Sequence, residues 1–390
     1  MRGPSFRATA VLITAFAATP SLLMAQAVQT VTLSQPDAQF TEPFDQVTAI
    51  RELRDGRVVV SDLFAKTVSV VDLRTGSATA IGREGQGPGE YAFPGGLVAL
   101  PGDTTLVVDP AQRRFLKIGP DLKPVGTISF PEGVGGIVSV KGADRQGRVY
   151  FQGSPFRGGP LGGPRGPDAE IPDSVALLRW HPAGKSIDSL GRIKIPAIAR
   201  ATSGTANARA VIMRPQPFSP SDDWSVTPEG RIGIARVGDY HVEWLGAPKV
   251  AGPAVRAARV PVTKGDKDEF GRRSQDPRGR VTIAVGGNAA GRGDGAPVAP
   301  QLPEPDWPEF KPPFVSNSVV AAPDGQLWVE RSQPAGAARL YDVFDAQGRL
   351  VRQVRLAPRS RVVGFGATSV YVAQTDADDL QVLQRFRRPA

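Results

Sequence analysis

Few side chains in this sequence could carry out chemistry. The 390 residues include two histidines, His181 and His241, and no cysteine. The absence of cysteine excludes disulfides, thiol nucleophiles and Cys-ligated zinc. A hydrolytic zinc site usually takes several His ligands, so two histidines disfavour one. His181 precedes Pro182 in a turn and His241 lies in an alternating run, and we interpret both as structural.

Asp62 and Asp109 are the best-placed carboxylates. Each follows a β-branched run at an equivalent position of a sequence repeat, which we interpret as the innermost strand of its unit. Carboxylates there can bind a divalent cation or tie neighbouring units together. Later units have other residues near this place, namely Phe151, Ala235, Glu330 and Ala373. Because no ring of ligands repeats, we favour the structural role and predict no catalytic residue, no metal site and no cofactor.

A second candidate set could bind a partner. Arginine and aromatic residues are enriched at recognition sites. The candidate binding residues, near predicted strand starts or in long loops, are Arg214, Phe218, Trp224, Tyr240 and Arg331. Packing inside the fold is an open alternative for Trp224 and Tyr240.

An internal repeat shows which elements must position these side chains. A turn, a β-branched run, a gap and a second alternating run recur six times. The turns are marked by Gly56, Gly102, Gly147, Gly230, Gly325 and Ala367, and three of the five intervals are close to 45 residues. Such units predict an all-β, six-bladed β-propeller, because one twisted sheet buries both faces only when neighbours pack around an axis.

The predicted propeller is a single domain over residues 28–390 with insertions at about 153–173, 196–221 and 263–313. The first insertion is rich in Gly and Pro and cannot be a strand. In the last one, residues 263–266 resemble a capping box and predict a short helix at 264–274. The final repeat ends after three strands, so we expect residues 29–34 to supply the outer strand of the last blade.

Residues 1–27 have the pattern of a signal peptide. Arg2 and Arg7 accompany an apolar run at 8–18, and residues 25–27 form an Ala-x-Ala cleavage site. No later segment is apolar enough to cross a bilayer. We therefore expect a soluble monomer that is periplasmic or secreted. Its formal charge of +9 is spread among acidic residues, and an exported protein seldom meets nucleic acid, so no nucleic-acid partner is expected.

Residues 82–97, GREGQGPGEYAFPGGL, carry a family resemblance together with residues 106–109 and 112–115. They resemble the NHL repeat and the signature of exported bacterial six-bladed propellers of NHL or TolB-like type. Such families include binding modules and enzymes, so the resemblance implies a fold and no particular activity. The glycines and Pro88 suit a tight path between blades, with Tyr91 and Phe93 packed into the gap. A nucleotide-binding loop is disfavoured because no strand-to-helix transition follows.

The sequence as a whole favours an exported propeller that binds a protein, peptide or glycan on one face of the ring. The alternative is a metal-dependent hydrolase or lyase, similar to lactonases, with calcium or another divalent cation in the central channel. Carboxylates converging at the channel mouth would distinguish this enzyme from a binding module. A structural scaffold with an extended apolar surface is a third possibility.

Overall fold

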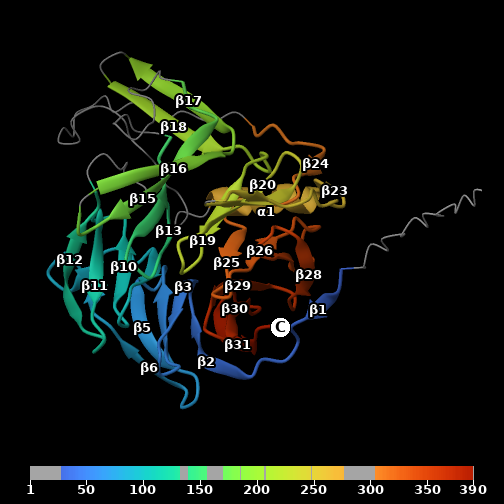
Figure 1. Cartoon of the computed structure of the whole chain (residues 1–390). Coiled ribbons are helices and arrows are strands. Elements are labelled where there is room, and N and C mark those ends of the chain that lie inside the picture. Colours follow the sequence, from blue (N-terminus) through green and yellow to red (C-terminus); the bar gives the residue numbers. More distant parts are fainter. Residues whose placement is uncertain are drawn as a thin grey trace, which may run out of the picture.

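The computed structural model describes residues 28–131, 139–155, 170–184, 186–205, 208–246, 248–275 and 304–389. The predicted signal peptide at 1–27 lies outside the described residues, as does most of the predicted insertion at 153–173. The described chain is all-β apart from one helix and forms the predicted six-bladed propeller (Figure 1).

Six antiparallel units of four strands form the blades, and the sheet of blade 5 has β1 (Thr30–Thr32) as a fifth strand (Figure 1). Blade 1 contains β3 (Val47–Glu52), β4 (Val58–Asp62), β5 (Thr67–Asp72) and β6 (Ser77–Ala80), and blade 2 contains β9 (Gly96–Ala99), β10 (Thr105–Asp109), β11 (Arg114–Ile118) and β12 (Pro124–Ser129). Blade 3 contains β13 (Ser139–Ala143), β14 (Val149–Gln152), β15 (Ser174–His181) and β16 (Ser186–Lys194), and blade 4 contains β19 (Asp223–Val226), β20 (Ile232–Arg236), β21 (His241–Leu245) and β22 (Val250–Ala251). Blade 5 contains β25 (Val319–Ala321), β26 (Leu327–Glu330), β27 (Leu340–Phe344) and β28 (Leu350–Arg355), and blade 6 contains β29 (Ser360–Phe365), β30 (Ser369–Thr375), β31 (Gln381–Arg387) and β2 (Ala38–Phe44).

The first strand of each blade lies at the centre of the ring. Consecutive first strands contact one another from β29 through β3, β9, β13 and β19 to β25. The repeat seen in the sequence therefore marks the second and third strands. This corrects the placement of Asp62 and Asp109, which end the second strands β4 and β10 and not the innermost ones. The second strands are the most regular in sequence because they are buried on both faces.

The hydrophobic core is divided among the spaces between blades. Six buried clusters are found in the described residues, one at each boundary between neighbouring blades. At the boundary of blades 6 and 1, for example, Phe40 and Tyr371 pack with Val58 and Val60. Each blade therefore buries its two faces against two different neighbours, as a propeller requires.

The N-terminal segment joins two blades. Strand β2 pairs antiparallel with β31 and forms the outer strand of blade 6, in the same sheet as three C-terminal strands. The segment expected in that place, residues 29–34, lies elsewhere: β1 (Thr30–Thr32) pairs in parallel with β28 of blade 5. Leu33, which follows β1, is buried in the core cluster of blades 5 and 6.

Polar contacts secure the boundary between blades 6 and 1 at both ends of β3. At its start, Val47 donates its amide to Gln381 at 3.0 Å, and its carbonyl accepts from Arg361. Burial lowers the pKa of Arg361, and the nearby charge of Arg339 lowers it further. At the other end, the Tyr371 hydroxyl donates to Glu52 at 2.6 Å. The last blade is thereby tied to the first through side chains as well as apolar packing.

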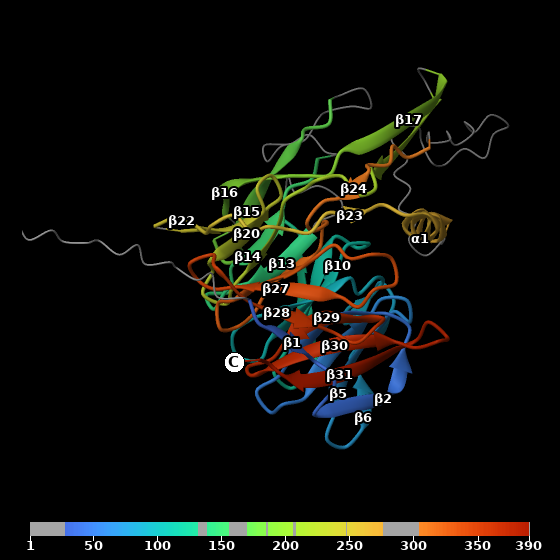
Figure 2. The same ribbon diagram turned by 90° about the vertical axis from the view of Figure 1, so that its right-hand side faces the viewer.

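The long connections all leave and re-enter the ring on one face. In an antiparallel four-stranded meander, the start of the first strand lies on the same side as the end of the second, the start of the third and the end of the fourth. The connections 153–173, 195–222 and 252–318 all join such ends, and we call this side the insertion face. Figure 2 shows β17 (Ile198–Thr205) and α1 (Lys264–Gln275) on the right-hand side of the ring and the C-terminus on the left.

The helix predicted at 264–274 is confirmed by α1. Within the described chain, no helix combines the length and apolar character needed to cross a membrane.

The closing strand gives a first testable prediction. Phe40 of β2 is 2% exposed and packs at the boundary of blades 6 and 1. We expect Phe40→Ala to lower the free energy of unfolding by about 3–5 kcal/mol, because it removes buried apolar surface and leaves a cavity. Chemical denaturation of residues 28–390, followed by circular dichroism, measures the change.

The exposed neighbour Thr41 supplies the matched control. Thr41→Ala in the same strand should change the stability by no more than about 0.5 kcal/mol. Equal effects of the two substitutions would contradict a closing role for the buried face of β2.

Candidate functional site

The second and third insertions build a structure that we call the cap, residues 195–222 and 252–318 of the described chain. It contains the hairpin of β17 with β18 (Ala208–Pro215), the two-residue strands β23 (Val260–Pro261) and β24 (Phe310–Lys311), and helix α1. The cap stands on the insertion face beside blades 3 to 5 (Figures 1 and 2).

A buried ion pair holds the cap together. At the start of α1, the Asp266 carboxylate accepts from the Thr263 amide and hydroxyl, both at 2.9 Å, as the capping pattern predicted. The Lys311 ammonium of β24 lies 2.5 Å from the same carboxylate, and the two side chains are 5% and 3% exposed. Lys311 also donates to the Gln333 carbonyl at 2.7 Å, and this contact ties the cap to blade 5.

The electrostatics of Asp266 follow from these partners. Burial by itself would raise its pKa, but the hydrogen bonds from Lys311 and Thr263 outweigh burial and the pKa is lowered. The carboxylate therefore stays ionised in the folded protein at neutral pH.

Three aromatic rings meet on the cap. Trp307 lies 5.4 Å from Phe270 of α1 and 6.3 Å from Phe218, measured between ring centroids. A cation lies over each ring: Arg214 over Phe270, Lys267 over Trp307 and Lys311 over Phe218, at 5.3, 5.5 and 5.2 Å from the ring centroids, respectively. The three rings are half-buried, so parts of them face solvent. Rings and cations arranged in this way suit ligands with flat apolar or sugar faces and anionic groups.

Two of the five predicted binding residues lie in this cluster. Arg214 ends the hairpin strand β18 with Pro215, and Phe218 follows in the connection to blade 4. The sequence analysis missed Phe270, Trp307 and Lys311. Their signal was aromatic and basic residues within a long insertion that is otherwise rich in Gly and Pro.

Trp224 lies in the interior. It is the second residue of the innermost strand β19, has 0% exposure, and packs in the core between blades 3 and 4. Its indole Nε1 donates to Gln152 at 3.4 Å. The packing alternative describes this side chain, and Trp224 forms no part of the cap surface.

Tyr240 and Arg331 meet at the boundary between blades 4 and 5. The Tyr240 hydroxyl and Arg331 Nη1 both donate to Asp342 Oδ2 at 2.7 Å, and Gln353 donates to the other carboxylate oxygen at 2.8 Å. Asp342 is fully buried, while Tyr240 and Arg331 are 2% and 8% exposed. Burial first, and then the charge of Asp342, raises the pKa of Tyr240 well above its ordinary value. This network fastens two blades.

A similar network lies among the innermost strands. Lys141 of β13 lies 2.9 Å from Asp223 of β19, and Asp223 Oδ2 accepts from the Ser318 and Val319 amides at 2.7 and 2.9 Å. Three consecutive innermost strands are joined in this way. Within the part of the chain that the structure describes, no group of three or more His, Cys, Asp and Glu side chains is arranged to hold a metal ion.

The two conspicuous aspartates are occupied by backbone groups. Asp62 accepts from the amides of Asp45 and Gln46 at 2.7 and 3.0 Å, on the segment that enters blade 1. Asp109 accepts from the Ala92 amide at 2.8 Å, on the segment that enters blade 2. Both therefore tie the entry of a blade to its second strand, whereas the structural role expected for them was a link between neighbouring blades.

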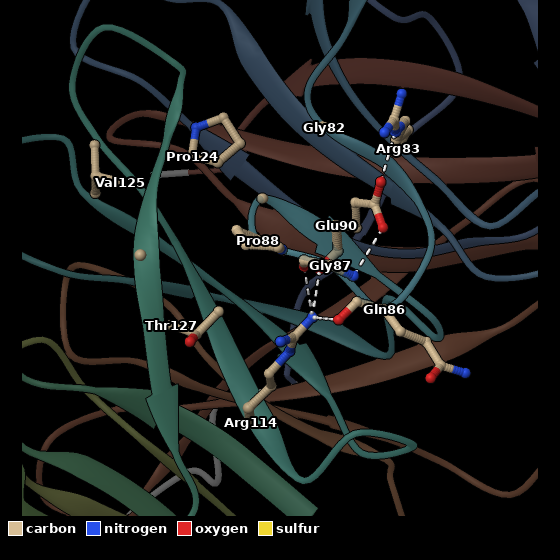
Figure 3. Close-up of a pocket in the computed structure, with 12 residues that line it drawn as sticks. Gly82, Arg83, Gln86, Gly87, Pro88, Glu90, Arg114, Pro124, Val125 and Thr127 are labelled. Carbon is tan, nitrogen blue, oxygen red and sulfur yellow. Dashed lines mark hydrogen bonds and ion pairs between the residues drawn. The ribbon is translucent and has the colours of Figure 1, made fainter.

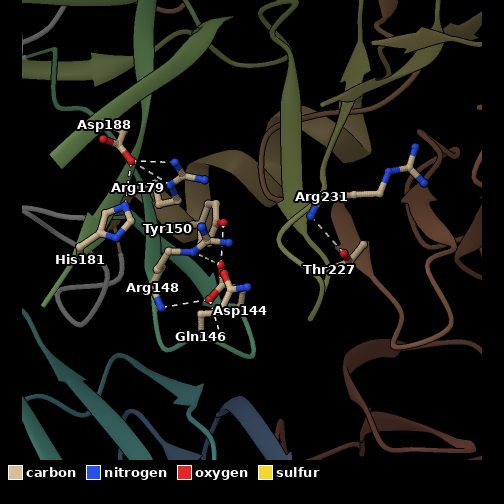
Figure 4. A network of polar contacts seen from close by, with 9 residues as sticks. All are labelled: Asp144, Gln146, Arg148, Tyr150, Arg179, His181, Asp188, Thr227 and Arg231. Carbon is tan, nitrogen blue, oxygen red and sulfur yellow. Dashed lines mark hydrogen bonds and ion pairs between the residues drawn. The ribbon is translucent and has the colours of Figure 1, made fainter. Parts of the chain in front are cut away.

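Both histidines pair with aspartates. His181 Nε2 lies 2.8 Å from Asp188, which also accepts from Arg179 at 2.7 Å, and Figure 4 shows this carboxylate between the two side chains. His241 Nδ1 lies 2.6 Å from Asp239. These contacts stay within blade 3 and within blade 4, respectively.

Comparisons with known proteins add the fold alone. No protein family model matches the sequence, and no curated protein is significantly similar to it. Among solved structures, the chain is similar to an exported protein from Bacteroides fragilis, with 11% identity, a TM-score of 0.45, and coverage of 92% of this chain and 94% of that one. It is also similar to a DUF4221 family member from Bacteroides vulgatus, with 7% identity, a TM-score of 0.48, and coverage of 90% and 96%. A gluconolactonase from Xanthomonas campestris has 14% identity, a TM-score of 0.40, and coverage of 90% and 91%.

These similarities do not indicate an activity. The identities and TM-scores are low, and the matched proteins have different descriptions, so they carry no argument about what this chain binds or converts. The functional argument therefore depends on the geometry of the chain itself.

The network of blades 4 and 5 gives a second prediction. We expect Arg331→Met to lower the free energy of unfolding by about 3–5 kcal/mol, because it leaves the buried Asp342 charge without its cation. The exposed Arg355 of the same blade is the control, and Arg355→Met should change stability by no more than about 0.5 kcal/mol. Urea denaturation measures both, and a near-neutral Arg331→Met would contradict a fastening role.

The ion pair in the cap gives a third prediction. Because the folded-state pKa of Asp266 is lowered, its stabilising contribution is present above its unfolded pKa of about 3.9 and is lost as the pH falls through the folded value. We expect amide protection of α1 in hydrogen exchange, corrected for intrinsic rates, to fall in acid. Asp266→Asn should show the reduced protection already at neutral pH. Equal neutral-pH protection in the two proteins would contradict this role of the carboxylate.

Proposed function

We propose that the protein is an exported binding module whose cap holds a protein, peptide or glycan partner. Supporting export is the signal-peptide pattern of residues 1–27. The observation that carries the binding proposal is the gathering of the long insertions on one face, where they form a cluster of half-buried aromatic rings and cations.

The ring and the cap have different requirements. The base of the cap is part of the ring core, because Phe314 is buried in the cluster of blades 4 and 5 and Ile195 in the cluster of blades 3 and 4. The aromatic cluster of Phe218, Phe270 and Trp307 is separate from these core clusters. Long insertions in a compact domain are usually functional or disordered. Here the cap also has its own buried ion pair and its own aromatic packing, and these contacts lie outside the core clusters of the ring.

The chemistry of the cluster limits the partner. Half-buried rings offer flat apolar surface, which suits apolar side chains or the faces of sugar rings. Lys267 is exposed beside Trp307, and a cation there favours an anionic group on the partner. We therefore expect a partner that combines an apolar or sugar surface with negative charge. No observation in the described residues favours the metal-dependent alternative, so it is not proposed.

Comparative capture tests the proposal. Immobilised residues 28–390, the Phe218→Ala and Trp307→Ala double variant, and a Val351→Ser control are each exposed to the periplasmic and extracellular fractions of the source organism and to a glycan array. We expect a ligand that the wild-type protein and the control retain, and that the double variant loses about tenfold or more, because truncating central aromatic residues removes most of the binding energy.

Val351 is a suitable control because it is exposed on the outer strand of blade 5, away from the cap. Thermal unfolding must be similar for all three proteins. A ligand that the double variant binds as tightly as the wild type would contradict the assignment to the cap.

A further inference from the structure

A groove lies at the rim of the ring, on blade 2 (Figure 3). Its volume is about 820 Å³. One wall is the glycine-rich turn Gly82–Glu90, which contains β7 (Arg83–Glu84) and leads into β8 (Glu90–Tyr91), and the other wall is residues 124–127 of the outer strand β12. Figure 3 shows Arg114 between the turn and Thr127.

The turn is a rigid wall. Tyr91, which follows it, is 1% exposed, and its hydroxyl accepts from the Val68 amide at 2.9 Å. Gly89 has a φ of +77°, and a Cβ added there would lie 3.3 Å from Pro124, so the turn rests directly on the start of β12. The predicted packing of Tyr91 into the gap between blades is confirmed.

The opposite wall is an unprotected sheet edge. The sequence of β12 is PVGTIS, with no charged residue, and Val125 is 56% exposed. Natural proteins usually protect edge strands with charges, bulges or a covering segment. In β12 the bulge lies only at the Pro124 end, and residues 126–129 pair regularly with β11.

The ladder fixes which backbone groups face outward. The Phe130 amide donates to the Arg113 carbonyl at 2.9 Å, so alternate residues 128 and 126 also face β11. The amides and carbonyls of Thr127 and Ser129 therefore point away from the blade, toward any strand added beside it. Blade 5 accepts such a strand within this molecule, because β1 pairs along the edge of β28.

Arg114 supplies an unneutralised charge at the base of the groove. Its Nη2 donates to three carbonyls, those of Gln86, Gly87 and Glu90, at 3.4, 3.2 and 2.9 Å. Its Nε is buried and has no hydrogen-bond partner. Within the described chain its guanidinium forms no ion pair, whereas Arg83 on the turn is paired with Glu90 at 2.7 Å. The groove therefore favours an anionic group.

Strand geometry brings an added carboxylate within reach of this charge. Arg114 pairs with Ser129 and Leu116 with Thr127, so Arg114 and Thr127 lie on one face of the sheet. A strand added outside β12 would lie about 4.8 Å beyond it, and thus about 10 Å from β11. An Arg and an Asp or Glu side chain together span that distance.

We propose that the groove binds an extended acidic peptide segment, which pairs with β12 as a fifth strand and places a carboxylate against Arg114. The outward amides of Thr127 and Ser129 bind the peptide backbone, as in other cases of strand addition. The turn covers the side chains on the groove face, and Arg114 selects for negative charge. This site is separate from the cap and does not depend on the function proposed for it.

A matched set of peptides tests the site. The probes are fluorescein-labelled octapeptides of alternating Thr and Val with a central Asp, Asn or Lys, titrated against residues 28–390 by fluorescence anisotropy. We expect the Asp peptide to bind about tenfold or more tightly than the Asn peptide, because the added pair is charge-assisted. Hydrogen exchange should show slower exchange at Thr127 and Ser129 in the complex.

A negative charge introduced into the groove gives a second test. Val125→Asp places an acid beside the peptide and should weaken the Asp peptide while strengthening the Lys peptide. Val351→Asp, at an exposed position of β28 in blade 5, is the matched control and should change neither. Arg114→Gln should abolish the preference for Asp over Asn, and Arg114→Lys, which keeps the charge, should retain part of it. Phe218→Ala in the cap should leave all three affinities unchanged.

Several results would overturn the proposal. One is the absence of measurable binding by the whole peptide set, and another is equal binding of the Asp and Asn peptides. Protection that maps to the cap in place of β12 would assign the peptide to the other site. Oligogalacturonate, an acidic oligosaccharide, is tested as well. If it binds in a way that depends on Arg114 but leaves hydrogen exchange at Thr127 unchanged, the ligand of the groove is an acidic sugar and not a peptide.

Discussion

Ring closure is the constraint on which the rest of the structure depends. Each blade is a sheet with two apolar faces, so none can remove its core from water until it has a neighbour on both sides. The six core clusters lie at the six boundaries, and the boundary between blades 6 and 1 must join the two ends of the chain. The burial of Phe40 and the contacts around Val47 make that join, and without them two faces would be exposed together.

Apolar packing alone would let blades slide against one another, and buried polar groups limit this. All five tyrosines are buried, and each hydroxyl has a specific partner. The hydroxyls of Tyr240 and Tyr371 donate to acidic residues on the next blade at 2.7 and 2.6 Å. The tyrosine hydroxyls of the ring are therefore engaged in contacts within and between the blades. The two recognition sites that we propose, on the cap and in the groove of blade 2, lie apart from these blade contacts.

The sequence predicted the ring well because its second strands, such as β4 with VVVSD, are buried on both faces and repeat clearly. It did not predict the closing strand, because β2 with AQFTEPF alternates weakly, contains Pro43 and has four exposed residues. Residue type alone could not show that Trp224 is buried in the core while Phe218 is partly exposed on the cap, because burial depends on which neighbours cover a side chain. The ion pair of Asp266 and Lys311 could not be predicted from the sequence either, because 45 residues separate the two side chains and only the folded cap brings them together.

The N-terminal segment also determines how the ring would respond to mechanical load. Thr30–Thr32 is attached to blade 5 by three residue pairs, whereas Ala38–Phe44 is part of blade 6. A pulling force applied at residue 28 therefore reaches the short parallel strand before it reaches the closing one. Detachment of β1 lengthens the free chain and relaxes the tension while blade 6 stays intact. A propeller attached through its N-terminus to a surface or a larger assembly would in this way tolerate small pulling forces while its ring stays closed.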